Sequence, residues 1–310
     1  MVRLPTILQK MKLPRFLFVS TIIIAVILAT VLIYFRVAVT SPEAAGDTKF
    51  TFIVFGIDND GGNADTILVA TFDSVNYTLN TVSIPRDTIL NIGSDIHRRA
   101  GLILPSMVER YQNRHDALTV TIGIFTDILG FEPDFHFVVD MEAFVALVDA
   151  IGGVEFYIPV DMNYADPYQD LFIRHTRGLH YLTGQQAIEV VRYRLTYEDG
   201  DIGRVRTQQN FLASAAQQIL NNPPNITEIA GIFLNYVETD LRLGELIWLA
   251  GEFLKMDTEN IHFATMPGSL HSADGMQYVM ISTVEWLEII NERLNPSHVE
   301  ITVQKLNIVQ

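Results

Sequence analysis

An unbroken run of uncharged, mostly apolar residues from Phe16 to Phe35 limits where this chain can fold. A helix needs about 20 such residues to cross the hydrocarbon core of a bilayer, and the run has that length. We therefore predict a transmembrane anchor over residues 16–36, so that only the following part builds a water-exposed domain. A cleaved signal peptide is the alternative, but the run is longer than a usual signal core and no small-x-small cleavage site closes it.

The charges around this run predict on which side of the membrane the folded part lies. The charged residues before the run are all basic: Arg3, Lys10, Lys12 and Arg15. Because short segments rich in basic residues stay in the cytoplasm, we expect a cytoplasmic tail at 1–15. A polar linker at 37–48 then leads to one extracytoplasmic domain at 49–310, held at the cell membrane by a single pass.

The composition excludes several classes of function. The 310 residues contain no cysteine, which excludes disulfides and cysteine-ligated metals. The formal net charge is −15, and the part beyond the anchor is more acidic still, because five of the 21 basic residues lie within the first 36. Nucleic acid is therefore not an expected partner, since phosphate backbones bind basic faces. Beyond residue 36, arginine outnumbers lysine 13 to 3, which indicates a specific use for arginine.

The hydrophobic pattern beyond the linker alternates between strands and helices. Strand-like runs cover 48–58, 66–73, 78–85, 135–140, 153–160, 261–267 and 299–304. Helical patterns cover 100–129, 141–153, 183–194 and 204–220, and the remainder adds two or three helices. Such alternation is typical of an α/β domain. We expect a central mixed β-sheet flanked by helices, in a three-layer sandwich.

Arginines are concentrated in one short segment of this acidic chain. A capping box at Thr183 and Gln186 begins a helix that leads into this segment, which contains Arg192, Arg194, Arg204 and Arg206. A guanidinium group pairs two oxygens of a phosphate or carboxylate at once. With Arg86 just after the strand at 78–85, this concentration predicts a phosphate or pyrophosphate site assembled from distant parts of the chain.

Several short motifs follow one another in an order and at a spacing typical of one family. They are Gly-x-Asp at 56–58, Ala-Asp-Thr at 64–66, Ser-Ile-Pro-Arg-Asp-Thr at 83–88, the Val-Val-Asp strand end at 138–140, Ile-Gly-Gly-Val at 151–154, Gly-Leu-His-x-Leu-x-Gly-x-Gln-Ala at 178–187, and Val-Arg-Tyr-Arg, Gly-Asp-x-Gly-Arg and Gln-Gln between 191 and 209. In these motifs the chain resembles the LytR-CpsA-Psr family of cell-envelope phosphotransferases, over about residues 50–220.

The resemblance implies a specific reaction and specific roles. A glycopolymer of teichoic-acid or capsule type, linked to polyprenyl pyrophosphate, would be transferred with one phosphate to a hydroxyl of peptidoglycan, with release of polyprenyl phosphate. Asp58 and Asp65 would hold Mg2+. Gln208 would support the head group, and the pyrophosphate oxygens would be bound by Arg86, Arg192, Arg194 and Arg204. A general base is expected at Asp87 or Asp201, and the sequence does not choose between them.

Elementary chemistry agrees with these implied roles. Mg2+ prefers carboxylate and phosphate oxygens. Phosphoryl transfer needs neutralisation of negative charge more than covalent chemistry from the protein, so arginines and a metal ion suffice.

Two segments depart from the usual pattern of the family. Asn63 and Ala64 stand where Arg-Ser usually precedes Asp-Thr, which removes one expected anion contact. Arg98 and Arg99 are candidates to replace it. The apolar stripe within 102–129 is a candidate lining for a polyprenyl tunnel, because the family has one, with ordinary core packing as the alternative.

Two other functions are compatible with the same residues. A pyrophosphatase would use water in place of the acceptor glycan. A non-catalytic envelope protein would bind the lipid pyrophosphate without turnover, as the altered loop at 63–64 favours. Product analysis separates the first of these from the transferase, and binding without turnover identifies the second.

Overall fold

The computed structural model describes residues 39–43, 48–58, 62–93, 98–166, 171–197, 201–273 and 276–309. The predicted tail and anchor, and part of the linker, lie outside these residues. Within the described ranges, no helix has both the length and the apolar character needed to cross a membrane.

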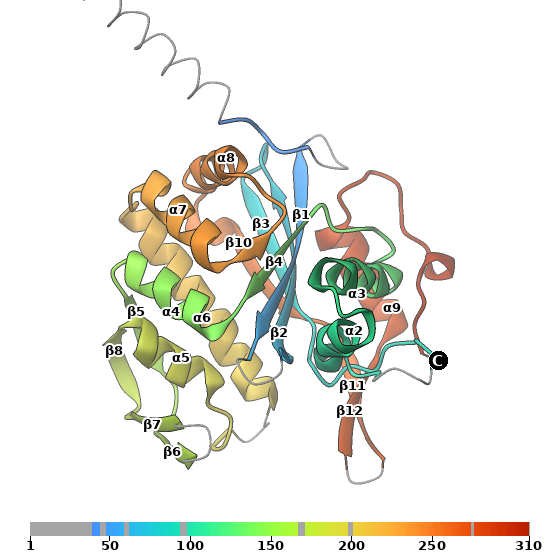
Figure 1. The fold of residues 1–310 in the computed structure, drawn as a ribbon, viewed down its shortest axis with the longest axis horizontal. Coiled ribbons are helices and arrows are strands. Elements are labelled where there is room, and N and C mark those ends of the chain that lie inside the picture. Colours follow the sequence, from blue (N-terminus) through green and yellow to red (C-terminus); the bar gives the residue numbers. More distant parts are fainter. Residues whose placement is uncertain are drawn as a thin grey trace, which may run out of the picture.

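A six-stranded sheet forms the centre of the domain, with strand order β10-β3-β2-β1-β4-β9 (Figure 1). Its strands are β1 (Lys49–Ile57), β2 (Ala64–Asp73), β3 (Thr78–Ser83), β4 (Phe135–Val139), β9 (Glu238–Thr239) and β10 (Ile261–Thr265). The pairs β1–β4 and β3–β10 are parallel, whereas β1–β2, β2–β3 and β4–β9 are antiparallel. The sheet is therefore mixed, as expected, and β2 and β3 pair across the predicted turn.

Helices cover both faces of this sheet (Figure 1). One side carries α2 (Ile103–Tyr111), α3 (Arg114–Leu129) and α9 (Thr283–Ile289). The other side carries α4 (Met141–Ala150), α5 (Gly184–Arg192), α6 (Asp201–Asn221), α7 (Ile226–Tyr236) and α8 (Leu243–Phe253). The predicted α/β architecture is confirmed.

Alternation along the central strands separates two apolar environments. In β1, Ile53 and Phe55 are fully buried in the main core with α2 and α3. Their neighbours Val54 and Gly56 point to the opposite face and line a cavity. Because successive side chains of a strand point to opposite faces, one apolar strand can serve both a solid core and a cavity.

Three two-stranded antiparallel sheets lie outside the central sheet. They pair β5 (Val154–Ile158) with β8 (Gly178–Leu182), β6 (Met162–Asp166) with β7 (Leu171–His175), and β11 (Gly268–Ala273) with β12 (Met276–Ile281). Short 3-10 turns occur at Ala100–Leu102, Thr258–Asn260 and Val303–Lys305, and a π-helical turn at Ile290–Leu294.

Two sequence predictions need correction. The helical pattern at 100–129 contains a break, because Gln112 has φ of 51° and the Asn113 side chain caps a new helix, α3. The expected strand at 299–304 is wrong. Ile301 is buried there, but its backbone N–H donates to the Asn291 side chain (2.8 Å) rather than to a neighbouring strand.

The predicted capping box at the start of α5 is confirmed. The Thr183 hydroxyl accepts a hydrogen bond from the Gln186 backbone N–H, and the Gln186 side-chain oxygen Oε1 accepts one from the Thr183 backbone N–H (3.0 Å). This cap matters for the site, because Arg192 is the last residue of the same nine-residue helix.

We predict that Thr183→Ala lowers the free energy of unfolding by about 1 kcal/mol, the usual effect of losing such a cap. Thr183→Ser keeps the hydroxyl oxygen and retains most of the stability. Urea denaturation followed by circular dichroism measures both variants. Equal stability of the alanine and serine variants would contradict this role of the cap.

Candidate active site

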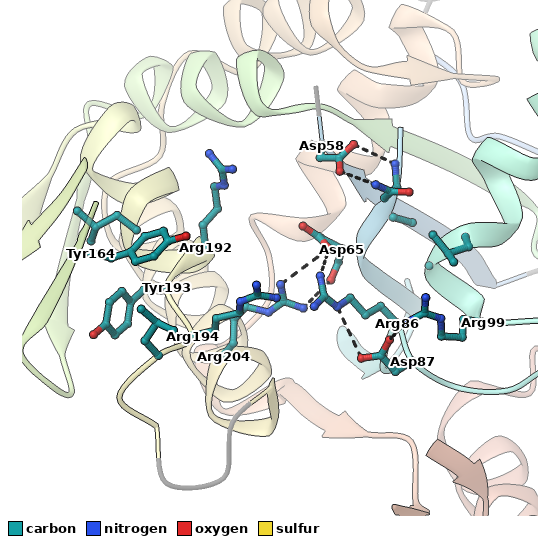
Figure 2. Close-up of a pocket in the computed structure, with 16 residues that line it drawn as sticks. Asp58, Asp65, Arg86, Asp87, Arg99, Tyr164, Arg192, Tyr193, Arg194 and Arg204 are labelled. Carbon is teal, nitrogen blue, oxygen red and sulfur yellow. Dashed lines mark hydrogen bonds and ion pairs between the residues drawn. The ribbon is translucent and has the colours of Figure 1, made fainter. Parts of the chain in front are cut away.

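A polar cavity of about 480 Å3 opens where β1 ends and β2 begins. Figure 2 shows the charged side chains that converge on it from both sides. Seven of the residues predicted from the sequence line this cavity: Asp58, Asp65, Arg86, Asp87, Arg192, Arg194 and Arg204. Segments more than 100 residues apart in the chain therefore build one site, as the distribution of arginines predicted.

The Asp65 carboxylate lies between two arginines from different elements (Figure 2). It accepts a short, ion-paired hydrogen bond from Arg86 Nη1, and Arg204 Nη1 lies 3.9 Å from the same oxygen. Arg204 Nη2 also donates to the Asp65 backbone carbonyl (3.3 Å). Asp65 thus joins the segment after β3 to the first turn of α6.

Burial and charge act differently on these two arginines. Burial lowers the pKa of Arg204, and the Asp201 carboxylate, 2.9 Å from Arg204 Nη2, only partly opposes this. Burial also disfavours the charged form of Arg86, but the nearby Asp65 carboxylate, followed by Asp201 and Asp87, raises the pKa of Arg86 above its usual value. Because arginine ordinarily keeps its proton far above neutral pH, both groups are cations at neutral pH.

These guanidinium groups have hydrogen-bonding capacity left over. The Nε atoms of Arg86 and Arg204 are buried and have no hydrogen-bond partner in the part of the chain that the structure describes. Buried donors without acceptors are costly. An anion with several oxygen atoms is the ligand chemistry that supplies the missing acceptors.

A second carboxylate, Asp87, joins Arg86 to Arg99, one of the two arginines predicted to replace the missing anion contact. Its oxygens lie 3.3 Å from Arg99 Nη1 and 3.8 Å from Arg86 Nε. Arg99 lines the cavity, whereas Arg98 bonds the Leu90 carbonyl (3.2 Å) and is not among the lining residues. Of the two candidates to replace the missing first-loop arginine, only Arg99 reaches the site.

Asn63, which stands where the family usually has arginine, donates hydrogen bonds to the acidic side chain of Asp58. The Asn63 backbone N–H and side-chain amide both donate to the Asp58 carboxylate, at 3.0 and 2.8 Å. No group of three or more histidine, aspartate or glutamate side chains suited to a metal ion occurs among the described residues. Asp58 and Asp65 remain a pair of carboxylates on the same cavity.

The cavity is cationic although the chain is acidic. Five arginines and three aspartates line it, whereas the whole chain has a formal net charge of −15. Arg194 is exposed and Arg192 half-buried. The two arginines at the end of α5 therefore stand near the solvent side of the site.

A second, apolar cavity of about 380 Å3 adjoins the polar one. The two share four lining residues: Asp58, Asp65, Arg192 and Arg204. The rest of its lining is mostly aliphatic or aromatic, with Gln208 beside Leu212 and Phe144. The Gln208 amide donates to the Val191 carbonyl (3.1 Å), so this predicted substrate-binding residue lies on the apolar side of the arginines. Asp201 lines neither cavity and reaches the site through Arg204.

The apolar space continues along the same face of the sheet. A third cavity of about 390 Å3 shares Val54, Ile151, Ile219 and Ile229 with the second and reaches α7 and α8. No residue of the stripe at 102–129 lines this apolar space, so of the two alternatives for the stripe, core packing is the one observed. Most of that stripe packs into the main core on the opposite face, because helical periodicity identifies an apolar face but not its partner.

We predict that Gly101→Ala weakens binding of inorganic pyrophosphate to the polar cavity. A Cβ at Gly101 would lie 2.7 Å from the Ala64 carbonyl oxygen and 2.9 Å from Arg86 Cβ, so the segment that carries Arg86 must shift. Titration calorimetry with pyrophosphate measures the effect.

Gly123→Ala is the control for this substitution. Gly123 is exposed within α3 and has nothing within 4 Å of the added carbon. It should gain about 0.5–1 kcal/mol of stability and bind pyrophosphate as the wild type does. Unchanged pyrophosphate affinity in Gly101→Ala would show that this contact does not position Arg86.

Known proteins share this fold and sequence pattern. The chain is 25% identical over 228 residues to the polyisoprenyl-teichoic acid–peptidoglycan teichoic acid transferase TagV of Bacillus subtilis, covering 71% of this chain and 57% of that protein. It is 28% identical over 244 residues to the cell wall biosynthesis protein LcpA of Corynebacterium glutamicum, covering 70% and 45%. The chain thus spans about half the length of these relatives.

Solved structures agree on the fold. The crystal structure of B. subtilis TagV superposes with a TM-score of 0.64 at 21% identity, covering 78% of this chain and 94% of that one. A structure of TagT bound to LI-WTA gives 0.62 at 18% identity, covering 85% and 96%. The model of the LytR_cpsA_psr family matches residues 34–294, most of the chain, and the chain therefore belongs to the LytR_cpsA_psr family.

Proposed function

We propose that this protein transfers a glycopolymer, carried on polyprenyl pyrophosphate, to a hydroxyl group of peptidoglycan and releases polyprenyl phosphate. One observation carries the proposal. The half-buried arginine–aspartate cluster stands at the junction of a polar and an apolar cavity, and four charged residues line both. A ligand that fits such a junction is anionic in the middle, apolar on one side and polar on the other.

The apolar side of the junction suits a polyprenyl chain. The second and third cavities follow the face of the sheet formed by alternate residues of β1 and β2, including Val54, Leu68 and Phe72. They extend towards α8, which lies near the start of β1 (Figure 1). The proposed membrane anchor precedes that end of the sheet in the chain, so a lipid from the same membrane would reach the arginines along this path.

Two relatives support the nature of the substrate. The name of TagV describes a transfer of teichoic acid from a polyisoprenyl carrier to peptidoglycan, and TagT has been solved bound to LI-WTA and to LIIa-WTA. We extend the same class of substrate to this chain, with an extracytoplasmic site and peptidoglycan as the acceptor.

The reaction needs little covalent chemistry from the protein. The acceptor hydroxyl oxygen attacks the phosphorus next to the glycan, and the bond from that phosphorus to the oxygen of polyprenyl phosphate breaks. The hydroxyl proton goes to a base. Asp87 suits this role better than Asp201, because Asp87 lines the polar cavity whereas Asp201 does not. Arg86 and Arg204 neutralise the charge that develops on the phosphate oxygens.

The carboxylates of Asp58 and Asp65 fit a magnesium ion. Mg2+ is usually held by one or two carboxylates together with phosphate oxygens of the substrate, and Asp58 and Asp65 line both cavities at the junction. When bound there, the ion would supply further neutralisation of the pyrophosphate charge. Asn63 would keep the Asp58 carboxylate oriented through its two hydrogen bonds.

We predict that the wild-type protein, given a polyprenyl-pyrophosphate glycan, Mg2+ and peptidoglycan fragments, releases polyprenyl phosphate and labels the acceptor with sugar phosphate. Arg86→Ala and Asp65→Ala should each reduce the rate by about 10²–10³-fold, the usual loss for one transition-state donor or its support. Arg110→Ala, which removes an exposed arginine outside both cavities, should leave the rate unchanged.

Three outcomes would redirect this proposal. Release without any label on the acceptor would identify a pyrophosphatase. Tight binding without release would identify a lipid-pyrophosphate binder. An unchanged rate after removal of Mg2+ by a chelator would exclude the metal role of Asp58 and Asp65 while leaving the transfer itself intact.

The apolar cavity gives a separate prediction. Ala215 lines it on α6, and Ala215→Phe would fill part of its volume. Turnover of long-chain polyprenyl donors should fall at least tenfold, because the lipid no longer fits, whereas affinity for inorganic pyrophosphate should stay as in the wild type. Equal losses for long-chain donors and for pyrophosphate would mean that the cavity does not hold the lipid.

A further inference from the structure

One amide on α6 connects the two elements that carry the central arginines. The Gln209 side-chain nitrogen donates to Ser83 Oγ (2.8 Å), to the Ala264 carbonyl (2.9 Å) and to Thr265 Oγ1 (3.1 Å). Ser83 and Thr265 are register partners at the carboxyl ends of the parallel strands β3 and β10. A single side chain therefore bridges the helix and both strand ends.

Each end of the bridge lies a few residues from one of the two central arginines. Arg204 precedes Gln209 by five residues on the same helix, and Arg86 follows Ser83 by three residues. The short segment between Ser83 and Arg86 has little freedom. Its Ile84 N–H bonds the Ile67 carbonyl (2.8 Å), and Pro85 has a fixed φ. A shift of α6 relative to β3 would thus separate Arg204 from Arg86.

The chemistry of this bridge favours glutamine. Its amide nitrogen has two hydrogens, which three acceptors share, and Ser83 itself is buried. An apolar side chain of similar length would leave buried acceptors without a donor. A glutamate would place a carboxylate against the Ala264 carbonyl. Gln209 is also absent from the residues that line the three cavities described above, so it acts without touching the substrate.

We propose that Gln209 is a positioning residue. It holds Arg204 and Arg86 at a spacing that lets both pair with Asp65 and bind the same pyrophosphate group. This inference rests on the proposed function for its substrate. It assigns to Gln209 a role distinct from that of its neighbour Gln208, which lines the apolar cavity.

The chain offers a matched control on the same helix. Gln218 also bridges α6 to other backbone: its amide donates to the Ile151 carbonyl (3.5 Å) and the Gly153 carbonyl, and it accepts from the Glu155 N–H (3.2 Å). It lies nine residues further along, roughly 14 Å away at the rise of an α-helix. Gln209→Met and Gln218→Met therefore remove comparable bridges, near to and far from the arginines.

The experiment compares both variants in the full chain by thermal denaturation, by calorimetry with inorganic pyrophosphate and by the transfer assay. Both should lower Tm to a similar degree. Only Gln209→Met should weaken pyrophosphate binding and lower kcat, by roughly 10- to 100-fold, as expected for misplaced catalytic groups. In an Arg204→Lys background the same change should add less than its full loss, because both changes disturb the same pairing of Arg204 and Arg86 around Asp65.

Each outcome decides the inference. Equal pyrophosphate affinity and kcat in the two glutamine variants would overturn it and leave the proposed function intact. Full additivity with Arg204→Lys would also overturn it. If the wild type binds pyrophosphate but transfers nothing, the proposed transfer fails and the affinities still decide the role of Gln209. If the wild type neither binds nor transfers, both proposals fall.

Discussion

The candidate site depends on one carboxylate, that of Asp65, because it allows two guanidinium groups to stand close together in a largely buried place. Arg204 is nearly inaccessible to solvent, and an unpaired cation there would carry a large desolvation cost. Asp65 reduces that cost for Arg204 and Arg86 together. It does not satisfy every donor of the two arginines. The same contact that stabilises the site therefore leaves it able to bind an anion with several oxygens.

The central sheet explains why an apolar cavity lies directly beside this charged cluster. Ile67 and Val69 of β2 point into the solid core, while Thr66 and Leu68 point to the cavity side. Asp65 stands at the start of the same strand and lines both cavities. The register of β1 and β2 shifts at this point, because Gly56 pairs with Thr66 and Ile57 with Ala64, so Asp65 lies in a β-bulge. A strand with a charged residue at its bulged start and apolar residues further along its cavity side can thus present a head group and a lipid chain with adjoining surfaces.

Much of this arrangement could be predicted from local pattern, and the failures have physical causes. The capping box at Thr183 and the strand before Arg86 are set by neighbouring residues, so the sequence predicts them well. The sequence offered Arg98 and Arg99 as equal candidates to replace the missing anion contact, and it is a β-bridge between Ile89 and Arg99 that brings only Arg99 to the cavity. The run at 299–304 looked like a strand, yet its apolar residues reflect burial of Ile301 without strand pairing. A hydrophobic pattern in the sequence indicates which residues are buried. It does not identify the segment against which they pack, which only the tertiary structure shows.

The loop that contains Asn63 lacks the arginine that the family usually has there, yet the cavity keeps an excess of positive side chains. Asn63 is neutral, so this position supplies no cation, but Asn63 fixes the Asp58 carboxylate through two hydrogen bonds. Arg99, held by Asp87, adds a cation to the lining of the cavity. Five arginines against three aspartates still line the site. The attraction of a multivalent anion depends on the summed electric field of all charges around the cavity. A cation elsewhere on the cavity wall can therefore compensate for the positive charge that is missing at position 63. The altered loop is therefore consistent with a working anion site, and the position of Arg99 gives the physical reason.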